Sequence, residues 1–194
     1  MKEYLDSIMN TICDAVHNLN YEKIDEIVVD MINGINNGNK IIFTGLGKNA
    51  PICKKIEGMM LSFGIDATFL ETNSAMHGDL GSIHARDVVI ILSKSGETIE
   101  SLNLLNVLKT RDVCIWGITF EDDSTMAKML EKVLVIHMKN EGDLWDIVPN
   151  NSTTLYLIVL QAIVIQVASK LGITKDTFRQ NHPGGGIGVK LSGQ

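Results

Sequence analysis

Apolar residues recur along the chain with two different spacings, and their order predicts an α/β fold. Helical spacing appears between residues 5 and 16 and again between 24 and 35, which predicts two opening helices within residues 1–36. Short runs rich in β-branched residues then predict strands at 40–45, 67–71, 87–93, 113–119 and 133–138. Helical patterns are found at 51–62, 98–109, 124–130 and 152–171.

Several of the predicted strands are apolar throughout, as in "VVIIL" (88–92). Such strands are buried on both faces, and their alternation with helices predicts a parallel sheet between two helical layers. We therefore expect a doubly wound, three-layer α-β-α sandwich with a five-stranded parallel sheet. We expect a single domain over 1–194, made of N-terminal helices (1–36), an α/β core (40–171) and a C-terminal tail (172–194).

The polar stretch "SKSGET" (93–98) directly follows the apolar third strand and leads into a helix. In doubly wound folds, ligands bind beyond the carboxyl ends of the strands. The hydroxyls of Ser93, Ser95 and Thr98, together with the free amides of a helix N-terminus, suit a phosphate. The alternative is that Ser95 only caps the helix while Glu97 complements the helix dipole.

A second polar stretch, "TGLGKNA" (44–50), follows the first predicted strand. It lacks the third glycine of the dinucleotide fingerprint and the G-K-[ST] ending of a P-loop, so it gives little support to a nucleotide. Thr44 is followed by Gly45, and the glycines of this stretch let the backbone approach a ligand closely. Lys48 stands at the mouth of the predicted cleft.

Two histidines lie in glycine-containing loops: His77 in "MHGDLGSI" and His182 in "NHPGGGIG". The second stretch is too rich in glycine for a helix or strand, and we expect it to wrap against another surface, such as a neighbouring subunit. Lone loop histidines are more often surface residues, and we interpret the others so: His17, His84 and His137. No Cys/His cluster predicts a metal site, and we expect no metal and no cofactor.

Composition and charge narrow the classes of partner. The chain carries 17 basic and 23 acidic residues, a net charge of -6, without the basic cluster that nucleic-acid binding requires. The longest apolar run (155–168) is interrupted by two glutamines and is too short to cross a bilayer. The N-terminus lacks a secretory pattern, and three distant cysteines fit reduced thiols. We expect a cytoplasmic protein with neither nucleic-acid nor membrane partners.

The motifs "TGLGK", "HGDLG", "SKSGET", "PNNSTT" and "HPGGGIG", in this order, resemble the sugar isomerase (SIS) domain. "SKSGET" alone indicates only the broad superfamily, but the pairing of "HGDLG" with "HPGGGIG" resembles the D-arabinose 5-phosphate isomerases in particular. The resemblance implies interconversion of D-arabinose 5-phosphate and D-ribulose 5-phosphate, which feeds Kdo synthesis for lipopolysaccharide or capsule. It also implies a homotetramer with shared active sites, although a dimer stays open.

This resemblance also implies roles for individual residues. Glu100 is the base that moves a proton between C1 and C2, with Glu97 as its rival on the same helix. The residues that hold the phosphate are Ser93, Ser95 and Thr98. Those that serve ring opening and charge stabilisation are Lys48, His77 and His182. Further substrate-binding residues are Thr44, Gly45, Glu97 and Ser152.

The sequence departs from the family at two points. No pair of CBS domains follows the motifs, so we expect no regulation through such domains. "PNNSTT" stands where larger relatives read "PTSSTT", and the unusual "EGDLWDI" precedes it, which leaves substrate preference open. Two other functions remain: a non-catalytic sugar-phosphate sensor, although no helix-turn-helix segment is apparent, and another isomerase, such as one for 3-hexulose 6-phosphate.

Overall fold

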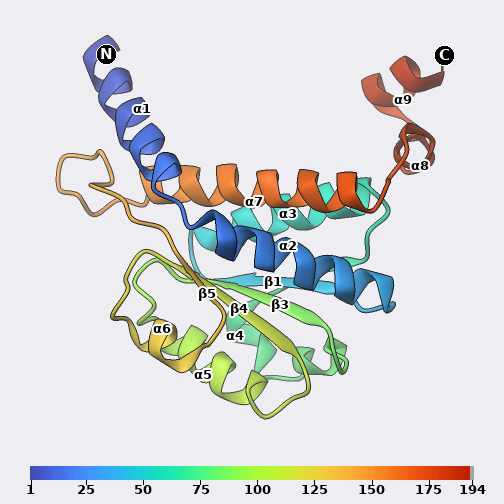
Figure 1. Ribbon diagram of the computed structural model, residues 1–194, viewed down its shortest axis with the longest axis horizontal. Helices are drawn as coiled ribbons and strands as arrows, with labels where there is room; N and C mark the ends of the chain where they lie inside the picture. The colour runs from blue at the N-terminus through green and yellow to red at the C-terminus, as the bar shows by residue number, and fades with distance from the viewer. Residues whose placement is uncertain (193–194) are drawn as a thin grey trace.

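The computed structural model of the chain describes residues 1–192, and the side chains of residues 1–190. Its centre is a sheet of five parallel strands in the order β2-β1-β3-β4-β5 (Figure 1). The strands are β1 (Ile41–Gly45), β2 (Ala67–Leu70), β3 (Val88–Leu92), β4 (Cys114–Thr119) and β5 (Val133–Val135). The order reverses between β1 and β3, which confirms the doubly wound sheet predicted from the sequence.

Helices cover both faces of this sheet. One layer contains α1 (Lys2–His17), α2 (Tyr21–Asn36), α3 (Asn49–Ser62) and α7 (Asn151–Lys170). The other contains α4 (Thr72–Ala75), α5 (Ile99–Leu108) and α6 (Thr125–Met129). Alternate residues of β3 divide between the layers, because Val88, Ile90 and Leu92 pack on the first and Val89 and Ile91 on the second. The three-layer sandwich is thus confirmed.

Helix α7 is the core helix of the first layer. It is long and apolar enough to cross a membrane, but half of its most apolar eighteen-residue window is buried inside the protein. Tyr156 shows how it is anchored: its hydroxyl donates a hydrogen bond to the carbonyl of Ile118 at 3.0 Å. Burial raises the pKa of Tyr156, so this phenol stays a neutral donor. The sequence prediction of a buried helix here is confirmed.

Strand β5 is shorter than the sequence predicted, since it ends at Val135 rather than at residue 138. It lies at the edge of the sheet beside β4, and the last residue pair of that ladder is Thr119 with Val135. The amide of Ile136 still donates to the carbonyl of Thr119 at 2.9 Å. Beyond this bond β4 has ended, so the following apolar residues have no strand beside them.

Four short elements lack a clear signal in the sequence: α4, η1 (Asp79–Ser82), α8 (Lys175–Gln180) and α9 (Gly185–Ser192). The expectation that "HPGGGIG" forms no helix is wrong, because α9 begins within it. Gly188 explains why the helix can form. A Cβ there would lie 2.8 Å from the carbonyl oxygen of His182 and 3.0 Å from Pro183, so only glycine lets this turn close.

Candidate active site

The exits of β1 and β3 lie side by side at the point where the strand order reverses. Gly45 and Leu92 are paired in the sheet register, and Asn49 Nδ2 donates to the carbonyl of Leu92 at 3.2 Å. A Cβ at Gly45 would lie only 2.8 Å from Asn49 Cβ and 3.2 Å from Leu92 O. The absence of a side chain at Gly45 therefore lets the "TGLGK" and "SKSGET" stretches meet at one edge of the sheet.

The loop formed by residues 93–98, here called the phosphate loop, is fixed to the end of β4. The amide of Ser93 donates to the carbonyl of Ile118 at 3.2 Å. The carbonyl of Lys94 accepts from the amide of Phe120 and from Thr119 Oγ1, each at 2.9 Å. These bonds fix the first residues of the loop to the end of β4.

The phosphate loop also carries groups that suit an anion. Ser95 is exposed, while Ser93 is buried with its Oγ 3.3 Å from Thr98 Oγ1. Thr98 is the N-cap of α5, yet within residues 1–192 its side chain makes no capping hydrogen bond to the helix. The first amides of α5 thus keep their capacity to bind an oxyanion.

Glu97 joins the phosphate loop to α6. Its carboxylate accepts hydrogen bonds from the amide of Thr125 at 2.6 Å and from Thr125 Oγ1 at 2.7 Å. The hydrogen bond from the backbone amide of Thr125 lowers the pKa of Glu97 most, and the hydrogen bond from the Thr125 hydroxyl lowers it further. Just before it, Gly96 has φ +63, and a Cβ there would lie 2.3 Å from Ser124 Oγ. The carboxylate of Glu97 is therefore engaged with the start of α6.

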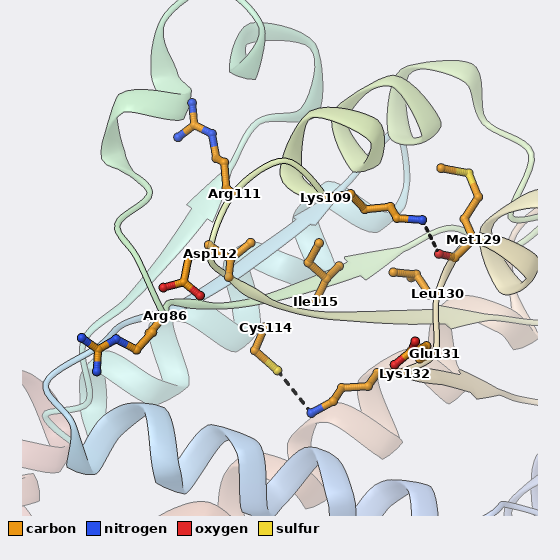
Figure 2. A pocket seen from close by; sticks show the side chains of 11 residues that line it. Arg86, Lys109, Arg111, Asp112, Cys114, Ile115, Met129, Leu130, Glu131 and Lys132 are labelled. Atoms are coloured by element: carbon orange, nitrogen blue, oxygen red, sulfur yellow. Dashed lines mark hydrogen bonds between the residues drawn. The ribbon is translucent and has the colours of Figure 1, made fainter.

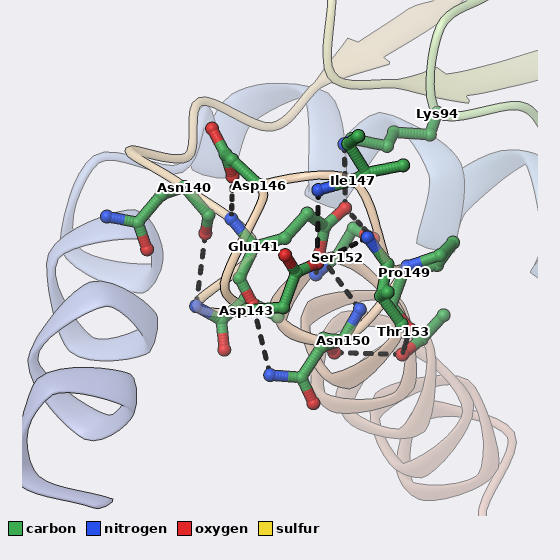
Figure 3. Close-up of polar contacts among 12 residues, drawn as sticks. Lys94, Asn140, Glu141, Asp143, Asp146, Ile147, Pro149, Asn150, Ser152 and Thr153 are labelled. Atoms are coloured by element: carbon green, nitrogen blue, oxygen red, sulfur yellow. Dashed lines mark hydrogen bonds and ion pairs between the residues drawn. The ribbon is translucent and has the colours of Figure 1, made fainter. Parts of the chain in front are cut away.

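Glu141 is a central residue that the sequence analysis missed. Its carboxylate is completely buried, and Oε1 accepts from Lys94 Nζ at 2.7 Å and from Ser152 Oγ at 2.6 Å (Figure 3). Oε2 accepts from the amides of Asn150 and Ser152, both at 2.9 Å. Glu141 thus caps the N-terminus of α7 and pairs with the phosphate loop.

The charge of Glu141 is maintained by these donors. Burial raises its pKa, but the hydrogen bonds from Lys94, Ser152 and Asn150 outweigh burial, so the pKa lies below the ordinary value. The sequence could have indicated the role of Glu141 only if Glu141 had been paired with Lys94, which lies far away along the chain. Without that pairing, "EGDLWDI" reads as a polar loop.

Two predicted substrate-binding side chains have partners inside the protein. Ser152 is fully buried and donates its hydroxyl to Glu141. Thr44 is also fully buried, with its Oγ1 3.0 Å from Thr72 Oγ1 at the start of α4. The second bond ties the exit of β1 to the exit of β2, and so brings the "HGDLG" segment to the same edge of the sheet.

Lys48, His77 and Glu100 are all exposed. Lys48 stands at the start of α3, His77 follows α4, and Glu100 lies in the first turn of α5. Beside Lys48 there is a cleft of ≈ 310 Å³ between α3 and the N-terminal part of α7. These side chains thus come from the starts of α3 and α5 and from the segment after α4.

His182 lies between α8 and α9, which Figure 1 shows beyond the C-terminal end of α7. Its ring stacks on Phe178 with the centroids 4.1 Å apart, and Asn181 Nδ2 donates to the carbonyl of Ser62, at the end of α3, at 3.3 Å. Helix α7 separates this place from Glu141, and its 20 residues span about 30 Å. One chain therefore does not bring His182 together with the other candidate residues.

A larger hollow, of ≈ 510 Å³, lies near the start of β4, away from the phosphate loop (Figure 2). Lys109 Nζ donates to the carbonyl of Met129 at 2.9 Å, and Lys132 Nζ contacts Asp30 at 2.6 Å. Figure 2 shows Arg86 and Arg111 pointing apart. Since its cations do not converge, we do not regard this hollow as the site. Within residues 1–192, no group of His, Cys, Asp or Glu side chains could hold a metal ion.

Comparison with known proteins identifies the family of the chain. The model of the SIS domain family matches residues 34–166. The chain belongs to the SIS domain family. It is 35% identical over 152 residues to the arabinose 5-phosphate isomerase KdsD of Yersinia pestis, covering 78% of this chain and 46% of that protein. It is 36% identical over 151 residues to KpsF of Escherichia coli O6:H1, again covering 78% of this chain and 46% of that protein.

This SIS domain spans about half the length of the curated relatives it matches. Its fold also matches a solved structure from Escherichia coli CFT073 in complex with arabinose 5-phosphate, with a TM-score of 0.86 and 26% identity over 94% of this chain and 95% of that chain. The sugar isomerase domain of an RpiR transcription factor from Sphaerobacter thermophilus has the same fold, with a TM-score of 0.73, 16% identity and coverage of 99% and 97%.

The role of Glu141 can be tested with Glu141→Gln. Glutamine keeps the volume but loses the charge that pairs with Lys94. Its side-chain NH2 group is a donor, and it would face other donors that need an acceptor. We expect the free energy of unfolding at pH 7 to fall by roughly 2–3 kcal/mol, measured by urea denaturation. The matched variant Glu131→Gln, at an exposed glutamate, should leave it unchanged.

The wild type and Glu141→Gln should also differ in how their stability depends on pH. Because the folded-state pKa of Glu141 is lowered, its contribution to stability is present above the ordinary pKa of 4.5 and is lost as pH falls through the folded pKa. The wild type should therefore lose stability more steeply below pH 4.5 than Glu141→Gln. Parallel curves for the two proteins would contradict the assignment.

Proposed function

We propose that this SIS domain is a D-arabinose 5-phosphate isomerase, which interconverts D-arabinose 5-phosphate and D-ribulose 5-phosphate through an enediolate. The observation that carries the proposal is the phosphate loop at the switch point of the sheet, with the uncapped N-terminus of α5 behind it. The names of the relatives support the choice of sugar. In the family that the motifs resemble, this reaction feeds Kdo synthesis in the cytoplasm.

The phosphate would bind to the first amides of α5 and to the exposed hydroxyl of Ser95. Binding there is remote from the reacting carbons, so its energy can position C1 and C2 against the catalytic groups. Lys94 cannot serve as a free phosphate ligand in the observed arrangement, because its ammonium group is paired with Glu141 at 2.7 Å. Its role is to hold the loop in shape.

The proton transfer falls to Glu100 in this proposal. Both Glu97 and Glu100 lie at the start of α5, but the carboxylate of Glu97 is bonded to Thr125, while Glu100 is exposed beside the phosphate loop. Lys48 and His77 would open the sugar ring and stabilise the enediolate oxygen. The hydrogen moves within the substrate, so the net reaction needs no redox cofactor.

Incubation with D-ribulose 5-phosphate tests the function directly. We expect D-arabinose 5-phosphate to appear and to be identified against authentic aldose phosphates by chromatography and NMR. Formation of a different aldose phosphate would assign another isomerase activity. If no sugar phosphate turns over but one raises the melting temperature, the protein is a sensor and the proposal fails.

The assignment of the base is tested by comparing Glu100→Gln with Glu97→Gln. Loss of the basic oxygen of Glu100 should lower kcat by roughly 10²–10⁴-fold and slow the exchange of the transferred proton with solvent deuterium, with little change in KM. Glu97→Gln should lower the melting temperature and leave kcat close to that of the wild type. The reverse pattern would make Glu97 the base.

Because His182 lies far from the phosphate loop of its own chain, we propose that active sites are shared between the subunits of a homotetramer. Subunit complementation tests this role of His182. Glu100→Gln and His182→Ala proteins, each inactive alone, should regain activity when mixed, because some sites then combine two intact groups. Subunit exchange is verified by native mass spectrometry. Failure to regain activity after proven exchange would place His182 outside a shared site.

A further inference from the structure

His77 lies in an exposed segment that is anchored on both sides by buried residues. Before it, the short helix α4 contributes Thr72 and Ala75, which are both buried. After it, Leu80 of η1 is buried, and its carbonyl accepts a hydrogen bond from Arg111 Nη1 at 2.8 Å. The residues between Ala75 and Leu80 are all exposed. The fold therefore fixes both ends of this segment and leaves its middle to local contacts.

One side-chain hydrogen bond spans this segment. Ser74 Oγ donates to Asp79 Oδ2 at 2.6 Å, a length typical of a hydroxyl group bonded to a carboxylate. The amide of His77 also donates to the carbonyl of Ser74, at 2.8 Å. Residues 74–79 thus form a closed turn that carries His77. We call these six residues the histidine turn.

Ser74 is itself held in place by its neighbours. Glu71 Oε2 accepts from the amide of Ser74 at 2.7 Å and so caps α4. Thr72, two residues before Ser74, is bonded to Thr44 at the exit of β1. Helix α4 also packs beside α5, which begins at the phosphate loop. A chain of contacts therefore runs from the sheet to Ser74 and, through its hydroxyl group, to Asp79.

The histidine turn needs this bond because a glycine follows His77. Gly78 has φ +123, a conformation that residues with a side chain rarely adopt. The backbone at such a residue changes its conformation easily unless other contacts restrict it. A group that acts on a substrate has to be held firmly, since a misplacement of about 1 Å can lower the rate roughly 100-fold. The bond between Ser74 and Asp79 supplies the restriction.

The same bond contributes little to the stability of the fold as a whole. It is exposed to solvent, and both α4 and η1 are anchored by buried residues without it. Its loss would leave these anchors intact and would change mainly the turn between them. The residue on that turn to which the motif resemblance gives a chemical role is His77.

We infer that Ser74 and Asp79 are positioning residues for His77, and that their hydrogen bond fixes the place of its imidazole in the reaction. Neither side chain has to touch the substrate in this role. The inference rests on the proposed function, because it concerns the use of His77 in that reaction. The existence of the closed turn does not rest on it.

Steady-state kinetics of four variants tests this role. Ser74→Ala and Asp79→Ala should each lower kcat by roughly 10–100-fold with little change in KM, because the phosphate loop is untouched. Ser74→Thr keeps the hydroxyl group and Asp79→Asn keeps an acceptor oxygen, so each should recover most of the loss. If Asp79→Asn is as inactive as Asp79→Ala while Ser74→Ala is normal, Asp79 acts on the substrate itself and the inference is wrong.

A double-mutant cycle with His77→Gln shows whether the effect passes through His77. In that background Ser74→Ala should lower kcat no further. An equal loss in both backgrounds would contradict the inference, since Ser74 would then act on another group. The matched control is Ser82→Ala, whose hydroxyl group donates to the carbonyl of Asp79 at 2.7 Å from outside the histidine turn. It should leave kcat unchanged.

Amide hydrogen exchange tests the histidine turn without any measurement of activity. The amides of residues 76–79 should exchange severalfold faster in Ser74→Ala than in the wild type, as measured by mass spectrometry of a peptide that contains His77. Ser82→Ala should keep the wild-type rate there. Equal exchange in Ser74→Ala and the wild type would overturn the inference, whether or not the protein isomerises a sugar phosphate. Failure of the proposed function is seen separately, as a wild type that turns over no sugar phosphate.

Discussion

The arrangement of the candidate site depends on one buried carboxylate, that of Glu141. A fully buried charge is stable only where donors surround it, and here they come from the first amides of α7, the hydroxyl of Ser152 and the ammonium group of Lys94. Satisfying this charge fixes the start of the longest helix relative to the phosphate loop. The loop is thereby held between Glu141 on one side and the end of β4 on the other.

Within this frame, neighbouring residues of similar chemistry have different environments. Glu97 precedes the N-cap of α5 and Glu100 lies in its first turn, yet the first is bonded to Thr125 and the second is exposed. The two serines of the loop differ likewise, since Ser93 is buried and Ser95 is exposed. The fold thus separates groups that build the site from groups that can reach a ligand, which the sequence motif alone does not.

The sheet and its two helical layers could be predicted, because runs such as Val88–Leu92 report burial on both faces directly. The helix at the tail could not, since it depends on the close contact of Gly188 with the preceding turn. Glu141 was missed because its partner Lys94 is distant in sequence. The order of motifs also gives no placement in space, so the distance of His182 from the other candidates emerges only from the fold.

The contact between the phosphate loop and α6 has a consequence for protein engineering. Gly96 leaves no room for a side chain against Ser124, and Glu97 is anchored on Thr125. The "SKSGET" motif is therefore half of a two-part module whose other half lies about thirty residues later, at the start of α6. Grafting the motif alone into another scaffold would transfer the hydroxyls without their geometry, so the start of α6 has to be transplanted with it.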